Sequence, residues 1–227
     1  MSQINNQKII ALLLYPGFTA LDLVGPHHIF SVLDGYEVHL VWKTKELVTS
    51  DTGLSIQPTL TIDECPEELA VLFVPGGTSG TVEMMQDEEI LSWLRSRRPN
   101  YITSVCTGAL ILGAAGLLQG YKATTHWIAL DLLKTLGAEP VANRIVEDRN
   151  RFTGGGVTAG IDFGLALAAK LKDERYAQWV QLVMEYSPQP PFQSGSPNEA
   201  SEELTTMSRQ MFEPFLQAAA AAASSDG

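Results

Sequence analysis

The sequence is poor in cysteine and lacks long apolar runs. Its 227 residues include two cysteines, Cys65 and Cys106, which do not form a CxxC pair. A chain with so few cysteines rarely carries a structural disulfide, so we expect two free thiols and no cysteine-based zinc site. No stretch reaches the roughly 18 consecutive apolar residues of a transmembrane helix, so we expect no membrane span.

Basic residues are also scarce. Lys and Arg number 15 against 26 Asp and Glu, which gives a net charge of −11. An acidic surface repels phosphate backbones, so we expect no nucleic-acid partner. The first residues, "MSQINNQ", are polar and lack the basic start of a secretory signal, so we expect a cytoplasmic protein.

Histidine is too sparse to build an obvious metal site. The four histidines are His27, His28, His39 and His126. None lies next to Cys106 in the sequence, and no two have zinc-ligand spacing with a third donor. We therefore expect no metal, and a Cys–His pair could arise only through folding.

Short apolar runs alternate with helical patterns along most of the chain. Several runs are apolar on both faces, which is typical of parallel strands buried between helices. The pattern predicts a mostly parallel, doubly wound α/β fold. Strands are predicted at 8–14, 36–43, 69–75, 101–105 and 141–147, and helices at 20–33, 87–97, 107–117, 126–136, 158–171 and 173–186.

We interpret residues 1–227 as one domain with a helical extension over about 199–227. The stretch "SPQPPFQSGSPN" (187–198) holds four prolines and is predicted to be a loop. The helix after it is predicted to be interrupted at Pro214. The alanine run 218–223 is expected to be loosely attached, and the last residues, "SSDG", to fray.

The stretch "YITSVCTGALILGAAGLL" places Cys106 where a strand passes into a helix. Small neighbours permit a tight turn that exposes the thiol, and the unpaired amides of a helix N-terminus should lower its pKa. Ligands of open α/β sheets bind at the carboxyl ends of the strands. Cys106 is therefore a candidate nucleophile, with an ordinary buried cysteine as the alternative.

Asp22 is the candidate proton carrier. It lies in "TALDLVGP", just after the first predicted strand, among apolar neighbours and without an obvious Lys or Arg partner. Desolvation should raise its pKa, so that it can donate a proton near neutrality. The alternative is a carboxylate that only stabilises the helix dipole.

Two glycine-rich stretches, "FVPGGTSG" (73–80) and "FTGGGVTAG" (152–160), follow apolar runs. Neither matches G-x-G-x-x-G after the first strand or contains the lysine of a P-loop, so a nucleotide site is poorly supported. We interpret them as backbone amides close to a reacting group, with simple turns as the alternative.

These segments together resemble the DJ-1/PfpI superfamily, and within it the isocyanide hydratases. The resemblance runs from about residue 8 to 196 and rests on "YPGFTALDLVGP", "VLFVPGG", "YITSVCTGALILGAAGLLQGYKATTHW" and "FTGGGVTAGIDFGLAL". It implies a flavodoxin-like sandwich, related to class I glutamine amidotransferases, that needs no cofactor and usually forms a homodimer.

The resemblance also implies roles for individual residues. Cys106 matches the nucleophile, Asp22 the acidic residue after the first strand, and Thr107 the residue after the nucleophile, where protease-like members have histidine. Gly76 and Gly77 match the glycines whose amides lie near the cysteine. We also expect a small, apolar pocket lined by Trp127, Ile161 and Phe18.

The implied reaction hydrates an isocyanide to an N-substituted formamide through a thioimidate on Cys106. Three alternatives remain open. They are a glyoxalase or deglycase acting on methylglyoxal, the sensing domain of a transcription regulator, and a redox sensor that oxidises Cys106 to a sulfinate.

Overall fold

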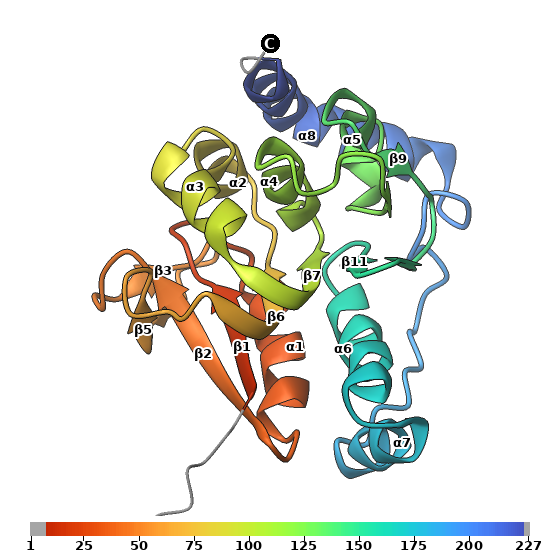
Figure 1. Cartoon of the computed structure of the whole chain (residues 1–227). Coiled ribbons are helices and arrows are strands. Elements are labelled where there is room, and N and C mark those ends of the chain that lie inside the picture. The colour runs from red at the N-terminus through yellow and green to blue at the C-terminus, as the bar shows by residue number, and fades with distance from the viewer. Residues whose placement is uncertain (1–7, 225–227) are drawn as a thin grey trace, which may run out of the picture.

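A seven-stranded sheet forms the centre of the protein (Figure 1), in a computed structural model that describes residues 8–224. The polar start of the chain and the predicted frayed end at 225–227 lie outside the described residues. The strand order is β10-β11-β7-β6-β1-β2-β5. The strands are β1 (Lys8–Leu13), β2 (Tyr36–Trp42), β5 (Leu60–Thr61), β6 (Glu68–Val74), β7 (Arg98–Val105), β10 (Ile145–Asp148) and β11 (Arg151–Gly154).

The sheet is parallel except at one edge, where β10 and β11 pair antiparallel. Helices cover both faces (Figure 1), so the predicted doubly wound α/β fold is confirmed. One group of packed helices contains α1 (Ala20–Ser31), α6 (Ala159–Leu171) and α7 (Glu174–Val183). The other contains α2 (Ser79–Met84), α3 (Glu88–Ser96), α4 (Gly108–Ala114), α5 (Leu132–Thr135) and α8 (Glu202–Ala223).

The central strands are apolar because both of their faces are covered. Residues 10–14 are fully buried, and β6 is buried from Leu69 to Val74. Phe73 of β6 packs with Phe30 and Phe163 beneath the α1–α6 layer. Continuous apolar runs of this kind are typical of parallel strands between two helical layers.

Two predicted elements are wrong. The helix expected over 126–136 is a 3₁₀ turn, η1 (Trp127–Ala129), followed by the short α5, because His126 Nδ1 accepts the Ile128 N–H and starts a tighter turn. The strand expected at 141–147 begins only at Ile145. Its partner β11 lies inside the "FTGGG" stretch, where the glycines conceal a buried strand that pairs with β7.

Five further two-residue strands were not predicted. One is β5 at the edge of the sheet, and the other four form two small ribbons, one from β3 (Val48–Thr49) with β4 (Ser55–Ile56) and one from β8 (Lys122–Ala123) with β9 (Glu139–Pro140). Two-residue strands are too short to show the alternation of apolar and polar residues by which a strand is predicted.

The C-terminal extension is better packed than expected. Helix α8 continues through Pro214, and its alanine run is attached to the body of the protein. Ala219 is fully buried and Ala222 is 6% exposed, and α8 contacts α2 and α5. The prediction of a loosely attached tail is therefore wrong over 218–223, because small alanine side chains let α8 approach its neighbours closely.

Candidate active site

Three neighbouring strands bring the predicted site residues together. β6 lies between β1 and β7 in the sheet. Asp22 is in the helix after β1, Gly76 is in the loop after β6, and Cys106 directly follows β7. Because the carboxyl ends of parallel strands share one edge of the sheet, these residues meet there.

Cys106 adopts the strained backbone of a nucleophile elbow. Its φ is 56°, in the left-handed region that non-glycine residues rarely occupy, at a typical cost of about 1–3 kcal/mol. Its N–H donates to the carbonyls of Gly154 (3.1 Å) and Gly155 (2.8 Å), and the Thr125 hydroxyl donates to its carbonyl (2.7 Å). These bonds hold the turn, as the strand-to-helix motif predicted.

The thiol itself is buried, and its pKa is raised rather than lowered. Cys106 is only 5% exposed. Burial raises the pKa of its thiol well above the usual value, the Asp22 charge raises it further, and the amides of Thr107 and Val157 act in the opposite direction. The expectation of an exposed, acidified thiol is therefore wrong, because desolvation outweighs the amides of the helix N-terminus.

Asp22 has the raised pKa that its apolar surroundings predicted. Its side chain has no solvent exposure, and burial raises the pKa of the carboxyl to about 7. The Gly76 N–H donates to Oδ2 at 2.9 Å, and this bond and the Cys106 thiol lower the pKa part of the way back. Oδ1 is buried and has no hydrogen-bond partner among the described residues.

The Thr107 hydroxyl binds a neighbouring peptide rather than Asp22. It donates to the Gly77 carbonyl (2.7 Å) and accepts the Gly77 N–H (2.9 Å), and it lies 2.9 Å from the Thr81 hydroxyl. Thr107 therefore contributes two separate groups: an amide directed at the thiol and a hydroxyl that holds the Gly77 loop.

The amides of Gly76 and Gly77 are already occupied. One binds Asp22 and the other binds Thr107, so neither is a free donor for a bound oxyanion or nitrogen. The donors near the sulfur are the Thr107 and Val157 amides. Val157 was not a candidate from the sequence alone, although it lies in the second glycine-rich stretch, where amides near a reacting group were expected.

Gly76 is required for packing. A Cβ placed on it would lie 2.6 Å from the Thr107 nitrogen and 2.8 Å from Asp22 Oδ2. Any larger residue would therefore push apart the carboxyl and the residue after the thiol. The glycine permits the close approach of the β6 loop to both groups.

The three predicted pocket residues have different positions. Phe18 is fully buried and its backbone forms a β-bridge with Gly77, so it supports the glycine loop. Ile161 packs against α1, where a Cβ on Gly25 would lie 3.3 Å from its Cγ1. Trp127 lines two adjoining cavities.

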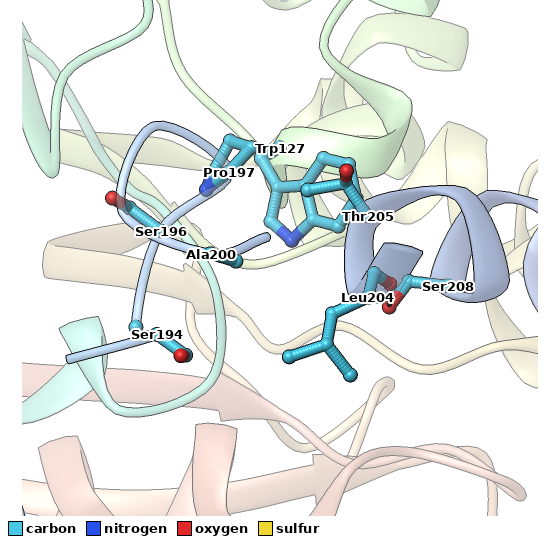
Figure 2. A pocket seen from close by; sticks show the side chains of 9 residues that line it. Trp127, Ser194, Ser196, Pro197, Ala200, Leu204, Thr205 and Ser208 are labelled. Carbon is cyan, nitrogen blue, oxygen red and sulfur yellow. Dashed lines mark hydrogen bonds between the residues drawn. The ribbon is translucent and has the colours of Figure 1, made fainter. Parts of the chain in front are cut away.

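The larger cavity has a volume of about 710 Å³ and is lined by residues from 124–131, 142–144, 155–158 and 195–199, with Arg209. The smaller one, of about 240 Å³, lies between Trp127, the loop from Ser194 to Ala200 and the start of α8 (Figure 2). Polar and apolar groups share both linings. The expected small, apolar pocket is therefore not what the described residues form at Trp127.

Within residues 8–224, no group of His, Cys, Asp and Glu side chains could hold a metal ion. The same part of the chain contains no helix with the length and apolar character needed to span a membrane.

The parallel α/β fold and the cysteine at the nucleophile elbow define a class of α/β proteins with a cysteine site. Sequence comparison identifies the family within this class. The model of the DJ-1/PfpI family matches residues 8–170, and the chain belongs to this family. An isonitrile hydratase from Pseudomonas putida is 52% identical over 210 residues, which cover 92% of this chain and 91% of the relative.

Solved structures agree with this assignment. The crystal structure of a ThiJ/PfpI family protein from Pseudomonas syringae superposes with a TM-score of 0.94 at 50% identity, covering 96% of this chain and 91% of that one. Drosophila melanogaster DJ-1beta has the same fold, with a TM-score of 0.72 at 19% identity. That match covers 80% of this chain and 100% of DJ-1beta.

Proposed function

We propose that this protein is an isocyanide hydratase, which adds water to an isocyanide and releases the N-substituted formamide. The observation that carries the proposal is the buried Asp22–Cys106 pair, in which Asp22 has a pKa of about 7 and a free Oδ1. The 52% identity to an isonitrile hydratase over most of both chains supports this substrate.

The first half-reaction consumes one thiol proton. Asp22 takes the proton of Cys106, and the thiolate attacks the terminal carbon of R–N≡C. The new S–C bond forms while Asp22 Oδ1 returns the proton to that carbon, which gives the thioimidate Cys–S–CH=N–R. The Thr107 and Val157 amides stabilise the sulfur while it is negatively charged.

Water completes the reaction. The Asp22 carboxylate removes a proton from water as the oxygen adds to the thioimidate carbon, and that proton passes to the nitrogen. The resulting tetrahedral species expels the Cys106 thiolate, the C–S bond breaks, and the hydroxyl proton returns to the Asp22–Cys106 pair. The product is R–NH–CHO, and no histidine is needed because no amine leaves.

The alternatives account for fewer of the observations. The chain is matched to the hydratase over nine-tenths of both lengths. For a DNA-binding role, residues 199–227 offer one arginine and no lysine, which is a poor composition for contacts to a phosphate backbone.

The direct test is turnover of p-nitrophenyl isocyanide, followed by formamide production, with methylglyoxal assayed in parallel. Wild-type protein should hydrate the isocyanide, and Cys106→Ala should abolish this activity. Retained turnover in Cys106→Ala would exclude covalent catalysis, and turnover of methylglyoxal alone would favour a glyoxalase.

The proposal includes a homodimer located in the cytoplasm. Leu21 and Val24 of α1 are 45% and 43% exposed on either side of buried Asp22, so a second copy packed on α1 would shield the site from water. Sedimentation equilibrium should give twice the 24.7 kDa chain mass.

A further inference from the structure

We propose that the C-terminal segment 194–209 is the specificity wall of the enzyme. In this proposal, the larger cavity holds the N-substituent of the isocyanide, and the segment limits how large that substituent can be. The inference rests on the proposed function. It adds a class of substrate, namely isocyanides with extended substituents that carry both apolar and polar groups.

The cavity lies directly behind the nucleophile elbow. Three of its lining residues contact Cys106: Thr125 donates to the Cys106 carbonyl, Gly155 accepts the Cys106 N–H, and the Val157 amide acts on the thiol. The first two contacts are to the Cys106 backbone, so the cavity adjoins a group bonded to the sulfur through Val157. At about 710 Å³, its volume is in the range of small-molecule sites.

The outer wall comes from a part of the chain that lies beyond the residues matched by the family model. The family model ends at residue 170, and DJ-1beta is covered completely by 80% of this chain. Segment 194–209 lies beyond the family model, yet it supplies Gly195, Ser196 and Arg209 to the cavity lining. The match to the isonitrile hydratase covers 92% of this chain, so the extension belongs to the shared length of these two proteins.

Trp127 is shared by the larger and the smaller cavity. It lines both, together with Gly195, Ser196 and Pro197, and Figure 2 shows it between the 194–200 loop and α8. The Arg209 guanidinium lies 5.3 Å from the centre of the Trp127 ring and has no ion pair within the described part of the chain. A polar group on the substituent can therefore bind Arg209 without breaking an existing salt bridge.

The residues that line the larger cavity determine which kind of N-substituent it can bind. Trp127, Ile128 and Val157 provide apolar surface, while Asn143 and Arg209 provide hydrogen-bond donors. An aryl or long alkyl group with a polar end satisfies both kinds of surface. A methyl group would leave most of the cavity empty.

Gly195 offers a direct test. Nothing lies within 4 Å of a Cβ placed on it, and its backbone is not in the left-handed region, so a side chain there extends into open space. Gly195→Trp should lower kcat/KM for p-nitrophenyl isocyanide by about tenfold or more and leave methyl isocyanide within about twofold of wild type. Trp127→Ala should join the two cavities and shift the ratio of the two kcat/KM values toward the aryl substrate.

Met211→Trp is the matched control, since Met211 lies on α8, is 68% exposed and lines neither cavity. It should leave both kcat/KM values unchanged. An unchanged aryl-to-methyl ratio in Gly195→Trp, with wild-type melting behaviour, would overturn the specificity wall. Absence of turnover of either isocyanide by the wild-type protein would instead overturn the proposed function.

Discussion

Asp22 and Cys106 act on each other's ionisation in the buried site. The thiol lowers the pKa of the Asp22 carboxyl, and the carboxylate raises the pKa of the thiol. Burial raises both pKa values, so a single negative charge on the pair costs free energy, and two negative charges cost much more. In the proposed mechanism, the reactive form is the pair with a single proton, which the two residues exchange during the reaction.

The pH dependence of kcat/KM should follow this pair. Below about pH 7 the pair carries two protons and no thiolate can form, so activity should rise as pH increases through the Asp22 pKa of about 7. The second proton is lost only well above pH 9, since the Cys106 pKa is raised. A rate profile measured from pH 5 to 10 that falls between pH 6 and 8 would contradict this order.

Asp22→Asn should lose about 10²- to 10⁴-fold in kcat, because the amide can neither accept the thiol proton nor deliver one to the isocyanide carbon. The Gly76 N–H can still donate to the Asn oxygen, so the loop should stay in place. Near wild-type turnover by a correctly folded variant would remove the acid–base role of Asp22.

The same substitution should change stability in a pH-dependent way. A carboxyl whose pKa is raised from 3.8 to about 7 on folding stabilises the protein only when protonated. This stability is fully present below pH 3.8 and is lost as pH rises through 7, for a total of up to about 4 kcal/mol. Thermal denaturation should therefore show the free energy of unfolding of Asp22→Asn rising relative to that of wild type between pH 4 and 7. Above pH 7 the difference between the two proteins should stay constant. An equal difference at pH 4 and pH 8 would contradict the shifted pKa.

Gly76→Ala should reduce both stability and activity. Its Cβ would lie under 3 Å from backbone and side-chain atoms of Thr107 and from Asp22, so the site must expand, at a cost of about 1–3 kcal/mol. Gly195→Ala adds the same methyl group in open space and serves as the control for stability alone. Urea denaturation would compare the two variants, and turnover of Gly76→Ala would be compared with wild type. Equal stability of the two variants would show that the Gly76 loop moves aside at no measurable cost.

Thr107 should act as a positioning residue through its hydroxyl. Thr107→Val keeps the shape and the amide but leaves the buried Gly77 N–H and carbonyl without their partner, at a cost of about 1–3 kcal/mol. Thr107→Ser retains the hydroxyl and should restore both stability and kcat. If Val and Ser variants share one pH–rate profile and one melting temperature, the Gly77 loop does not depend on this hydroxyl.

The strands and helices that could be predicted are those long enough to show a regular pattern of apolar residues in the sequence. The apolar runs that became β1, β2, β6 and β7 lie within two or three residues of their predicted bounds, as do most helices between them. The failures are short or glycine-rich. β11 lies in a glycine-rich stretch that we interpreted as backbone amides near a reacting group, so no strand was predicted there. The helix expected from His126 is shortened by a hydrogen bond between His126 and Ile128.

Asp22 and Cys106 could be chosen from the sequence because each stands out chemically from apolar neighbours. The sequence could not show that the amides of Gly76 and Gly77 are already taken, or that the Val157 amide faces the thiol. Hydrogen-bond partners far apart in the chain depend on loop conformations that composition does not encode.

The local sequence by itself determined the nucleophile elbow, since a strand that ends in a cysteine flanked by small residues and a helix start defines that turn. Tertiary structure decided the ionisation of the thiol. The helix N-terminus alone favours the thiolate, but packing excludes water from Cys106 and places Asp22 beside it. Desolvation and a neighbouring carboxylate outweigh two backbone amides and raise the thiol pKa, and for this reason the proposed mechanism uses a proton-sharing pair instead of a preformed thiolate.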